Sequence, residues 1–377
     1  MGLILTRSPY FITEQGLDEG ATLKLDIGYY STLGNFIEIE SYNFTINPTY
    51  GLDISPFVSD FFRDETRVLI VRTTIEGDVG GVEQTPIVTE YVATDGYGYY
   101  EDGYNYDATA LLESRSFYAG SNTDIQVYNS GVAKIPFLLA SDADGTVTIN
   151  YKKNGVIVDT ETIVLGAVYD SELLLATGYG SLLTDGAGNE INVGDYTVGD
   201  FIYTQTRFLT LTKDVSNLDI DSIDLVSEFG TYTLSVEYIC ECKYEPNRVS
   251  FVNKYGVVED LWFFKKSKEN LSVKKSEFNQ FTLDSYRYGV KSNHPYKIFN
   301  VNGKEKITMN TGYVPDSFNE NFRQLMLSES VYVEKNNEVL PINVSESSFE
   351  YKKHINDKLI NYKVQFEYAY NKINNIV

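Results

Sequence analysis

The sequence predicts a mainly β protein, in which two immunoglobulin- or fibronectin-like β-sandwich modules precede an α+β module with one amphipathic helix. Three observations lead to this fold class. The 377-residue chain contains 31 Tyr and 21 Phe, and aromatic side chains suit the half-buried surface of a sheet. Many segments alternate apolar and polar residues, which is the period of a strand. Turns rich in Gly, Asn and Asp separate these segments at short intervals, as in sandwich folds.

The first predicted module, residues 1–113, consists mainly of short strands. Leu23, Leu25 and Ile27 alternate with polar residues, so this strand has one buried face. Further strands are predicted at 9–13, 36–44, 67–74 and 87–94. The run 53–62 breaks the alternation. Ser55 before Pro56 is typical of an N-cap followed by proline at the first helical position, which predicts a short helix there.

Tyrosine is concentrated in the segment 94–107, which has five Tyr, three Gly and four acidic residues. Such a segment cannot bury a core of its own, and we therefore expect an exposed loop or hairpin. Tyrosine offers a flat, amphipathic contact surface at low entropic cost. The candidate contact residues are Tyr97, Tyr99, Tyr100 and Tyr104. Their expected partner is either a glycan or a neighbouring subunit.

The second predicted module spans residues 114–242. Its expected strands are 133–140, 146–152, 156–162, 201–212 and 231–244. Asn154-Gly155 lies between two alternating runs and is the strongest hairpin signal in the chain.

The third predicted module, residues 243–377, combines strands with one helix. Hairpins are expected around Gly256 and across Asn302-Gly303, Asn336-Asn337 and Asn356-Asp357. The helix is predicted over 317–329. Ser317 and Glu320 match a capping box, and apolar residues from Phe318 to Met326 recur with helical spacing.

Charge is distributed unevenly between these modules. Residues 1–242 hold 11 Lys and Arg against 37 Asp and Glu, a net charge of −26, whereas residues 243–377 hold 20 against 16, a net charge of +4. The acidic part would repel phosphates, which argues against nucleic acid as a partner. We interpret the first two modules as outward-facing and the third as a docking module.

Sequence patterns that indicate an enzyme, a cofactor or a membrane segment are not found. The two histidines, His294 and His354, have no Cys or acidic residue at ligand spacing, and Cys240 and Cys242 would lie side by side on one strand, which is poor geometry for a disulfide. Acidic turns at 95–107, 142–144 and 185–190 could hold Ca²⁺, but none matches an EF-hand. No run reaches the ~20 apolar residues of a membrane span, and no signal peptide is recognisable. We therefore expect no catalytic residues, no cofactor, no metal and no membrane insertion.

Three runs carry a resemblance to a known family. They are 6–12 (TRSPYFI) with 54–58 (ISPFV), 244–256 (YEPNRVSFVNKYG) with 261–266 (LWFFKK), and 359–370 (LINYKVQFEYAY). Together they resemble virion structural proteins of tailed bacteriophages that infect Bacteroidetes. The likeness covers both ends of the chain, and residues 80–240 match only in general style. The resemblance implies a structural protein of the tail or baseplate and carries no catalytic residues.

The expected function is therefore a structural component of a tailed-phage virion that links the tail core to fibres or other host-facing parts. The expected partners are other virion proteins, further copies of this chain around the tail axis, and tail fibres or a host surface glycan. Assembly in the bacterial host cytoplasm and a final location in the virion tail follow from the same resemblance. Two alternatives remain open: a carbohydrate- or receptor-binding tail protein for host attachment, and a neck, collar or head-decoration component.

Overall fold

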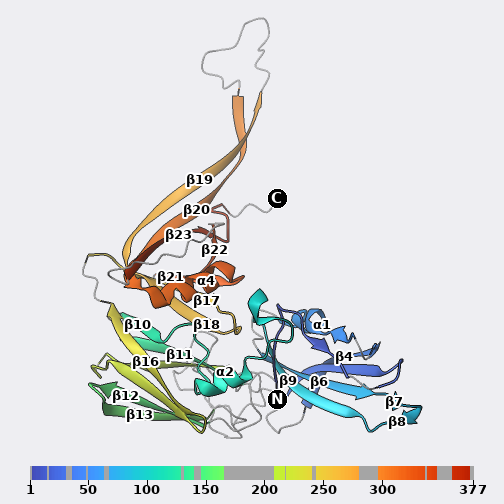
Figure 1. Ribbon diagram of the computed structural model, residues 1–377. Helices are drawn as coiled ribbons and strands as arrows, with labels where there is room; N and C mark the ends of the chain where they lie inside the picture. Colours follow the sequence, from blue (N-terminus) through green and yellow to red (C-terminus); the bar gives the residue numbers. More distant parts are fainter. Residues whose placement is uncertain are drawn as a thin grey trace, which may run out of the picture. The chain divides into compact units, whose positions relative to one another are not determined.

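A computed structural model describes residues 2–14, 17–30, 36–47, 50–62, 68–128, 131–139, 146–164, 208–216, 218–239, 243–279, 296–335, 338–345 and 359–373. The chain divides into two compact units. The first unit comprises Met1–Cys240 and Val252–Glu259, and the second comprises Glu241–Phe251 and Asp260–Val377. Both consist mainly of β-sheet, which confirms the predicted class (Figure 1). The predicted three-module division at 113/114 and 242/243 stays a prediction.

A five-stranded sheet forms the first part of the first unit, in the order β1-β9-β6-β3-β4. Its strands are β1 (Gly2–Leu5), β3 (Thr22–Tyr30), β4 (Phe36–Thr45), β6 (Val68–Glu76) and β9 (Ile87–Thr94). All neighbours are antiparallel except β1 and β9, which are parallel. A second, two-stranded sheet pairs β2 (Phe11–Ile12) with β5 (Leu52–Asp53), and β7 (Asp78–Val79) pairs with β8 (Val82–Glu83) between β6 and β9.

The inner face of this sheet packs against the short helix α1 (Ser55–Ser59) and β2. Leu23, Leu25 and Ile27 are fully buried in this core, as their alternation predicts. The helix begins one position earlier than expected, with Ile54 as its N-cap and Pro56 in its first turn. The hydroxyl of Ser55 instead donates a hydrogen bond to the carbonyl of Ser8 (2.7 Å), which attaches α1 to the N-terminal segment.

The second part of the first unit has a five-stranded sheet in the order β10-β16-β15-β12-β13 and a two-stranded sheet of β11 and β14. The strands are β10 (Asp124–Tyr128), β11 (Val132–Leu138), β12 (Thr146–Lys153), β13 (Val156–Val164), β14 (Phe208–Asp214), β15 (Ser222–Ser227) and β16 (Gly230–Ile239). Buried side chains from both sheets share one core, so this part is a sandwich. Asn154 and Gly155 both have positive φ (51° and 78°) and close the β12–β13 hairpin, as predicted.

The two parts of the first unit have the same topology. In each, the first strand pairs in parallel with the last, and three further strands complete the larger sheet: β6, β3 and β4 in the first part, and β15, β12 and β13 in the second. In each, the second and fifth strands pair to form the smaller sheet. The β7–β8 hairpin is an insertion that only the first part has among its described residues. Each part is therefore sandwich-like, with a larger and a smaller sheet.

Helical segments connect the two parts. A 3₁₀ turn η1 (Tyr100–Asp102) and the helix α2 (Thr109–Ser114) follow β9, and the sequence analysis predicted neither. One core cluster includes Leu3 of β1, Leu112 of α2 and Leu138 of β11, together with Tyr255 and Val257. The turn Val252–Glu259 is therefore packed into the first unit although its flanking strands belong to the second.

The second unit contains a seven-stranded sheet in the order β18-β17-β21-β22-β23-β20-β19. The strands are β17 (Asn247–Val252), β18 (Val258–Phe263), β19 (Lys265–Asn279), β20 (Tyr296–Pro315), β21 (Val331–Lys335), β22 (Glu338–Val344) and β23 (Leu359–Tyr368). The predicted pairing across Asn336-Asn337 is confirmed by the β21–β22 ladder. The turn of the predicted hairpin across Asn356-Asp357 lies outside the described residues.

The predicted hairpin across Asn302-Gly303 is wrong. These residues lie within the single long strand β20, where they pair with Lys274 and Val273 of β19. The register shifts just beyond them, and Asn300 has a positive φ of 50°. Neither Asn302 nor Gly303 has a positive φ, and the irregularity of the strand lies at Asn300, so the Asn-Gly dipeptide does not reverse the chain here.

The helix α4 (Asn319–Leu327) covers one face of this sheet, after the 3₁₀ turn η3 (Asp316–Phe318). It begins later than predicted, with Phe318 rather than Ser317 as its N-cap. Phe322 and Leu325 are buried as expected, and Phe322 lies 4.2 Å from Tyr362 between ring centroids. None of the described helices is long and apolar enough to cross a membrane.

Candidate interaction site

The tyrosine-rich segment 94–107 is closely packed in the first unit. Its backbone is held from both sides, because the N–H of Tyr97 donates to the carbonyl of Lys254 (2.8 Å) and the N–H of Gly98 donates to Ser8 Oγ (2.8 Å). Gly96 allows this close approach: a Cβ at that position would lie 2.5 Å from the carbonyl oxygen of Lys254. The segment is therefore a structural junction rather than a free loop.

Tyr97 is only 8% exposed, so the prediction of an exposed segment is wrong for this residue. Its ring lies edge-on to Tyr99 with centroids 5.7 Å apart, and the guanidinium of Arg7 lies 5.0 Å from its ring centroid. Alternation of Gly and Tyr gives no information on which rings face inward, because that depends on the segments packed against them.

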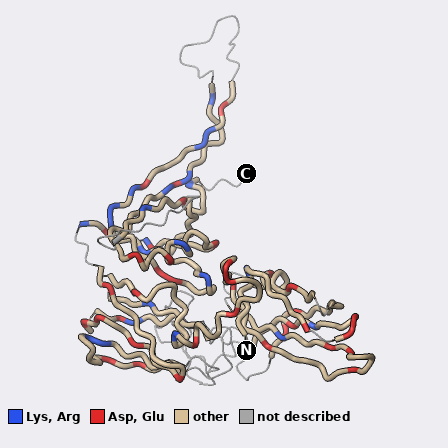
Figure 2. Tube along the Cα trace, in the orientation of Figure 1, with Lys and Arg blue, Asp and Glu red and all other residues tan. Residues whose placement is uncertain are grey.

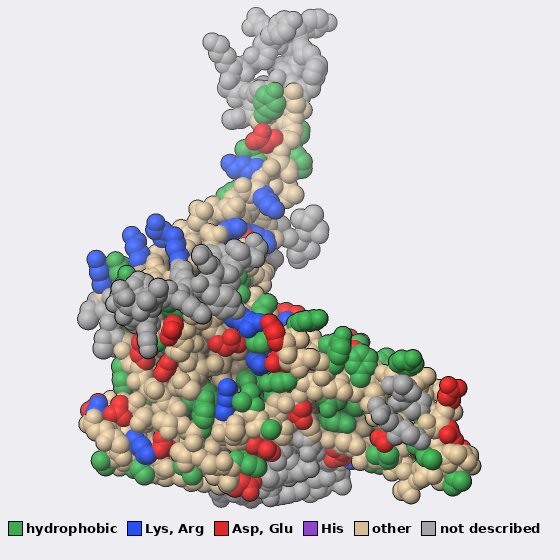
Figure 3. Space-filling model, in the orientation of Figure 1, with side chains coloured by type: hydrophobic (Ala, Val, Ile, Leu, Met, Phe, Trp, Pro, Cys, Tyr) green, Lys and Arg blue, Asp and Glu red, His purple; other side chains and the backbone are tan. Residues whose placement is uncertain are grey.

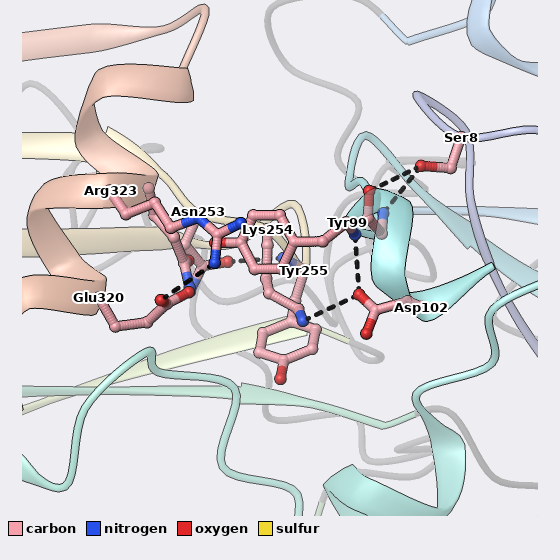
Figure 4. A network of polar contacts seen from close by, with 10 residues as sticks. Ser8, Tyr99, Asp102, Asn253, Lys254, Tyr255, Glu320 and Arg323 are labelled. Atoms are coloured by element: carbon pink, nitrogen blue, oxygen red, sulfur yellow. Dashed lines mark hydrogen bonds and ion pairs between the residues drawn. The ribbon is translucent and has the colours of Figure 1, made fainter. Parts of the chain in front are cut away.

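The ammonium of Lys254 lies among three aromatic rings of this junction (Figure 4). Its ammonium is 4.8 Å from the ring centroid of Tyr99, 5.1 Å from that of Tyr106 and 5.4 Å from that of Tyr255. The carboxylate of Asp102 is 3.7 Å away. A desolvated cation over aromatic faces is stabilised by the ring quadrupoles, and Asp102 compensates its charge.

Asp102 also shapes the turn that carries the tyrosines. Its carboxylate accepts a hydrogen bond from the N–H of Tyr99 (2.7 Å), and its own N–H donates to the carbonyl of Tyr99 (2.9 Å). These two bonds define the 3₁₀ turn η1. Burial raises the pKa of Tyr106, and the nearby charge of Asp102 raises it further, so this phenol stays neutral at physiological pH.

Asn253 holds the turn Val252–Glu259 in place from within. It is fully buried, and its amide donates to the carbonyl of Ala119 (2.7 Å) and to the carboxylate of Glu259 (3.1 Å). Its side-chain oxygen accepts from the N–H of Tyr255 (3.0 Å) and of Val257 (3.3 Å). All hydrogen-bonding groups of the amide are thus used locally, which fixes the position of Lys254 next to it.

Two of the four predicted contact residues project into solvent. Tyr100 is 97% exposed and Tyr104 is 75% exposed, whereas Tyr99 is half-buried beside Lys254. Tyr104 lies edge-on to Phe11, with centroids 5.8 Å apart, and Asn105 holds that position by hydrogen bonds to both backbone groups of Phe11. The structure therefore brings Tyr100 and Tyr104 to the surface of one rigid turn, and their role in binding stays a prediction.

Sequence reasoning missed Lys254 and Asn253, the residues that organise this junction. Both lie in the run 244–256 that carries part of the family resemblance, about 150 positions from the tyrosines that they contact. No local pattern links the two segments. The one available signal was an Asn before a Lys-Tyr-Gly turn, since Asn often binds the backbone of its own turn.

The candidate metal ligands give no site among the described residues, where no group of three or more His, Cys, Asp or Glu could hold a metal ion. In the segment 95–107, Asp102 pairs with Lys254, and Asp107 accepts hydrogen bonds from the N–H groups of Leu3 (3.1 Å) and Thr109 (2.9 Å). The acidic turns 142–144 and 185–190, both histidines and both cysteines lie outside the described residues.

No protein-family model matches the chain, and no curated protein is significantly similar to it in sequence.

Proposed function

We propose that this chain is a structural component of a tailed-bacteriophage virion, located at the tail or baseplate and present in several copies. The observation that supports this most directly is a long, exposed two-stranded hairpin, β19–β20, that carries apolar side chains on its surface. Exposed apolar surface of this kind is typical of a site that contacts another protein. The family resemblance of the runs at both ends of the chain supports the phage assignment.

The tandem immunoglobulin-like parts are consistent with a scaffold role. In the proposed arrangement the second unit docks onto the tail core, and the acidic first unit faces fibres or the host surface. Figure 2 shows acidic residues spread over the strands of the first unit and lysines along β19–β20.

Electron microscopy of virions assembled without this chain tests the proposal. We expect tails that are incomplete or lack peripheral density, and full recovery when the chain is supplied in trans. Complete, infectious tails without the chain would contradict it. A tag attached to the chain would distinguish a tail position from a neck, collar or head-decoration position.

A second candidate function is glycan binding during host attachment, because Tyr100 and Tyr104 are exposed aromatic rings on one rigid turn. Aromatic faces stack on sugar rings at low entropic cost. A glycan array with the full chain should then show signals that the double variant Tyr100→Ala, Tyr104→Ala loses. A matched variant, Tyr50→Ala, removes an equally exposed ring elsewhere and should change nothing. Absence of any signal from the unaltered chain would exclude this candidate.

A further inference from the structure

The β19–β20 hairpin extends beyond the sheet to which it belongs. Strand β23 pairs with β20 only from Lys306 to Pro315. Over residues 268–279 and 296–305, here called the arm, the two strands pair only with each other among the described strands. Figure 1 shows this ribbon continuing past β23. An isolated two-stranded ribbon is marginally stable in water at best.

Apolar side chains are exposed along the arm (Figure 3). Six large hydrophobic residues are exposed there: Leu271, Val273, Phe278, Tyr296, Ile298 and Phe299. Phe278 and Phe299 contact each other edge-on (5.5 Å between centroids), and no other described ring contacts either of them. Exposed apolar side chains on a ribbon that lacks a core are stabilised when another surface covers them.

The arm is also basic. It contains five Lys and three Glu. Two of the acids are neutralised within the second unit, because Glu269 pairs with Lys335 and Glu305 pairs with Lys372 (2.9 Å). Lys268, Lys274, Lys275 and Lys297 form no ion pair with a described acidic residue. The surface that covers the arm should therefore be apolar and acidic.

The first unit offers a surface of that composition at the β7–β8 hairpin. Four exposed β-branched side chains lie at this tip, which here includes the start of β9: Val79 and Val82 in the hairpin, and Ile87 and Val88 at the start of β9. Glu76, Asp78 and Glu83 surround them and are exposed. The tip is well ordered by backbone contacts, including the Asp78–Glu83 and Val79–Val82 pairs and a hydrogen bond from the N–H of Gly81 to Asp18 (2.9 Å). Lys and Arg are absent from the whole run 73–90.

We propose that the arm of one copy of this chain binds the β7–β8 tip of a second copy. This inference rests on the proposed function in one respect, the presence of several copies, and it names the two surfaces that meet. The contact is head-to-tail, since one copy contributes its arm and the other its tip. Repetition of such a contact closes a ring or extends a helical array, depending on the rotation between copies.

Pairing of two arms is the less favourable alternative. It would place lysines of one arm opposite lysines of the other, and like charges in contact cost several kcal/mol. Contact between arm and tip buries apolar surface on both sides and places lysines opposite carboxylates. The contact should weaken as salt is raised, because these charges lie at the surface.

Charge reversal on the full chain tests this arrangement. The arm variant carries Lys274→Glu, Lys275→Glu and Lys297→Glu, and the tip variant carries Asp78→Lys and Glu83→Lys. All five side chains are exposed, so both variants should retain the circular dichroism spectrum and thermal midpoint of the unaltered chain. The control variants Lys363→Glu and Glu228→Lys reverse exposed charges elsewhere.

Sedimentation velocity over a series of protein concentrations measures the association. We expect the unaltered chain and both controls to self-associate, and each reversed variant alone to associate at least about tenfold more weakly. A mixture of the arm and tip variants should associate again, because each acidic arm then meets a basic tip and each basic arm an acidic one.

Three outcomes would overturn the inference: an unaltered chain that stays monomeric, reversed variants that associate normally, or a mixture that fails to recover. These outcomes are separate from the virion experiment. Recovery by mixing, together with complete tails in virions that lack the chain, would keep this contact and reject the phage-tail function. Incomplete tails, together with a monomeric chain, would keep the function and reject the contact.

Discussion

At the scale of single residues, tyrosine has two different roles within one short segment. The ring of Tyr99 lies next to the ammonium of Lys254, and Tyr97 packs edge-on against Tyr99. Tyr100 and Tyr104, by contrast, project into solvent. The difference follows from the turn Val252–Glu259, which packs on one side of the segment and leaves the other free. Rearrangement of this buried aromatic cluster is unfavourable, because it would separate the ammonium of Lys254 from Asp102 and leave a buried charge without its partner.

Replacing Asn253 with Ala should strongly destabilise the first unit. The change removes the donor to the Ala119 carbonyl and leaves the N–H groups of Tyr255 and Val257 without their acceptor in a buried site. Buried polar groups that lose a partner cost about 1–3 kcal/mol each, so we expect a total loss of about 3 kcal/mol or more. Urea denaturation monitored by fluorescence measures it.

A matched control for this change is Asn43→Ala on β4, where the side chain is exposed. It should alter the free energy of unfolding by less than ~0.5 kcal/mol. Equal losses for the two variants would show that the Asn253 hydrogen bonds contribute nothing particular.

At the scale of elements, the hydrophobic pattern predicted the positions of strands and of the helix α4 well. Turn residues predicted the positions of hairpins less well. Asn154-Gly155 forms the expected hairpin, whereas the same kind of dipeptide at Asn302-Gly303 lies inside a long strand. An Asn-Gly dipeptide permits a chain reversal at either site. The partner strand decides whether the chain reverses there or continues as a strand. At Asn302-Gly303, β19 pairs with the residues on both sides of the dipeptide, so β20 continues as one strand through it.

Truncation of Phe322 in α4 tests the packing of this helix on its sheet. The ring is almost fully buried and contacts Phe263 (6.3 Å between centroids) as well as Tyr362. Phe322→Ala should cost about 3–5 kcal/mol in the stability of the second unit. Leu327→Ala on the same helix removes an exposed side chain and should cost far less. Similar losses in thermal denaturation would contradict this packing.

Glu237 on β16, an inner strand of the larger sheet in the second part of the first unit, predicts a pH dependence of stability. Burial raises the pKa of Glu237 above its ordinary value, and a hydrogen bond from Gln126 (3.4 Å) lowers it in part. The folded chain therefore keeps a proton at pH values where the unfolded chain has lost it. The free energy of unfolding should fall as the pH rises from the ordinary pKa of a glutamate through the raised pKa of Glu237.

Glu237→Gln removes the free-energy cost of burying a charged carboxylate. The variant should therefore be more stable than the unaltered chain at neutral pH. The advantage should vanish below the ordinary pKa of a glutamate, where both states are protonated. Glu228→Gln, at an exposed position, provides the comparison. Chemical denaturation at several pH values measures the difference, and an advantage that persists at acidic pH would show a cause other than titration.

At the scale of the whole molecule, two compact units carry opposite charge tendencies. The described strands of the first unit repeat one topology twice, and this repeat is invisible in the sequence because the corresponding strands share no motif. What is common to both is the pairing of the first strand with the last, a contact between distant segments. The first of the two similar parts carries the additional hairpin β7–β8. Surface insertions of this kind often carry the binding residues of a fold.

The charge of the first unit predicts a response to salt. Residues 1–242 carry a net charge of −26, and self-repulsion of that size destabilises a compact state. Raising sodium chloride from low ionic strength to physiological strength should raise the thermal midpoint of the first unit, because the Debye length falls to ≈ 8 Å. The second unit, with a net charge near neutrality, should respond less. Calorimetry at both salt concentrations measures the two transitions, and equal shifts would contradict this view.

The sequence by itself determined the mainly β class, most strand positions, the helix near 317–329 and the unequal charge. These features depend on local period and composition, which are readable without knowledge of the neighbours. Only the tertiary structure decided the strand order, the continuity of β20, the burial of Tyr97 and the position of Lys254 among the tyrosines. Each of these depends on which distant segments meet, and local patterns carry no information on that choice.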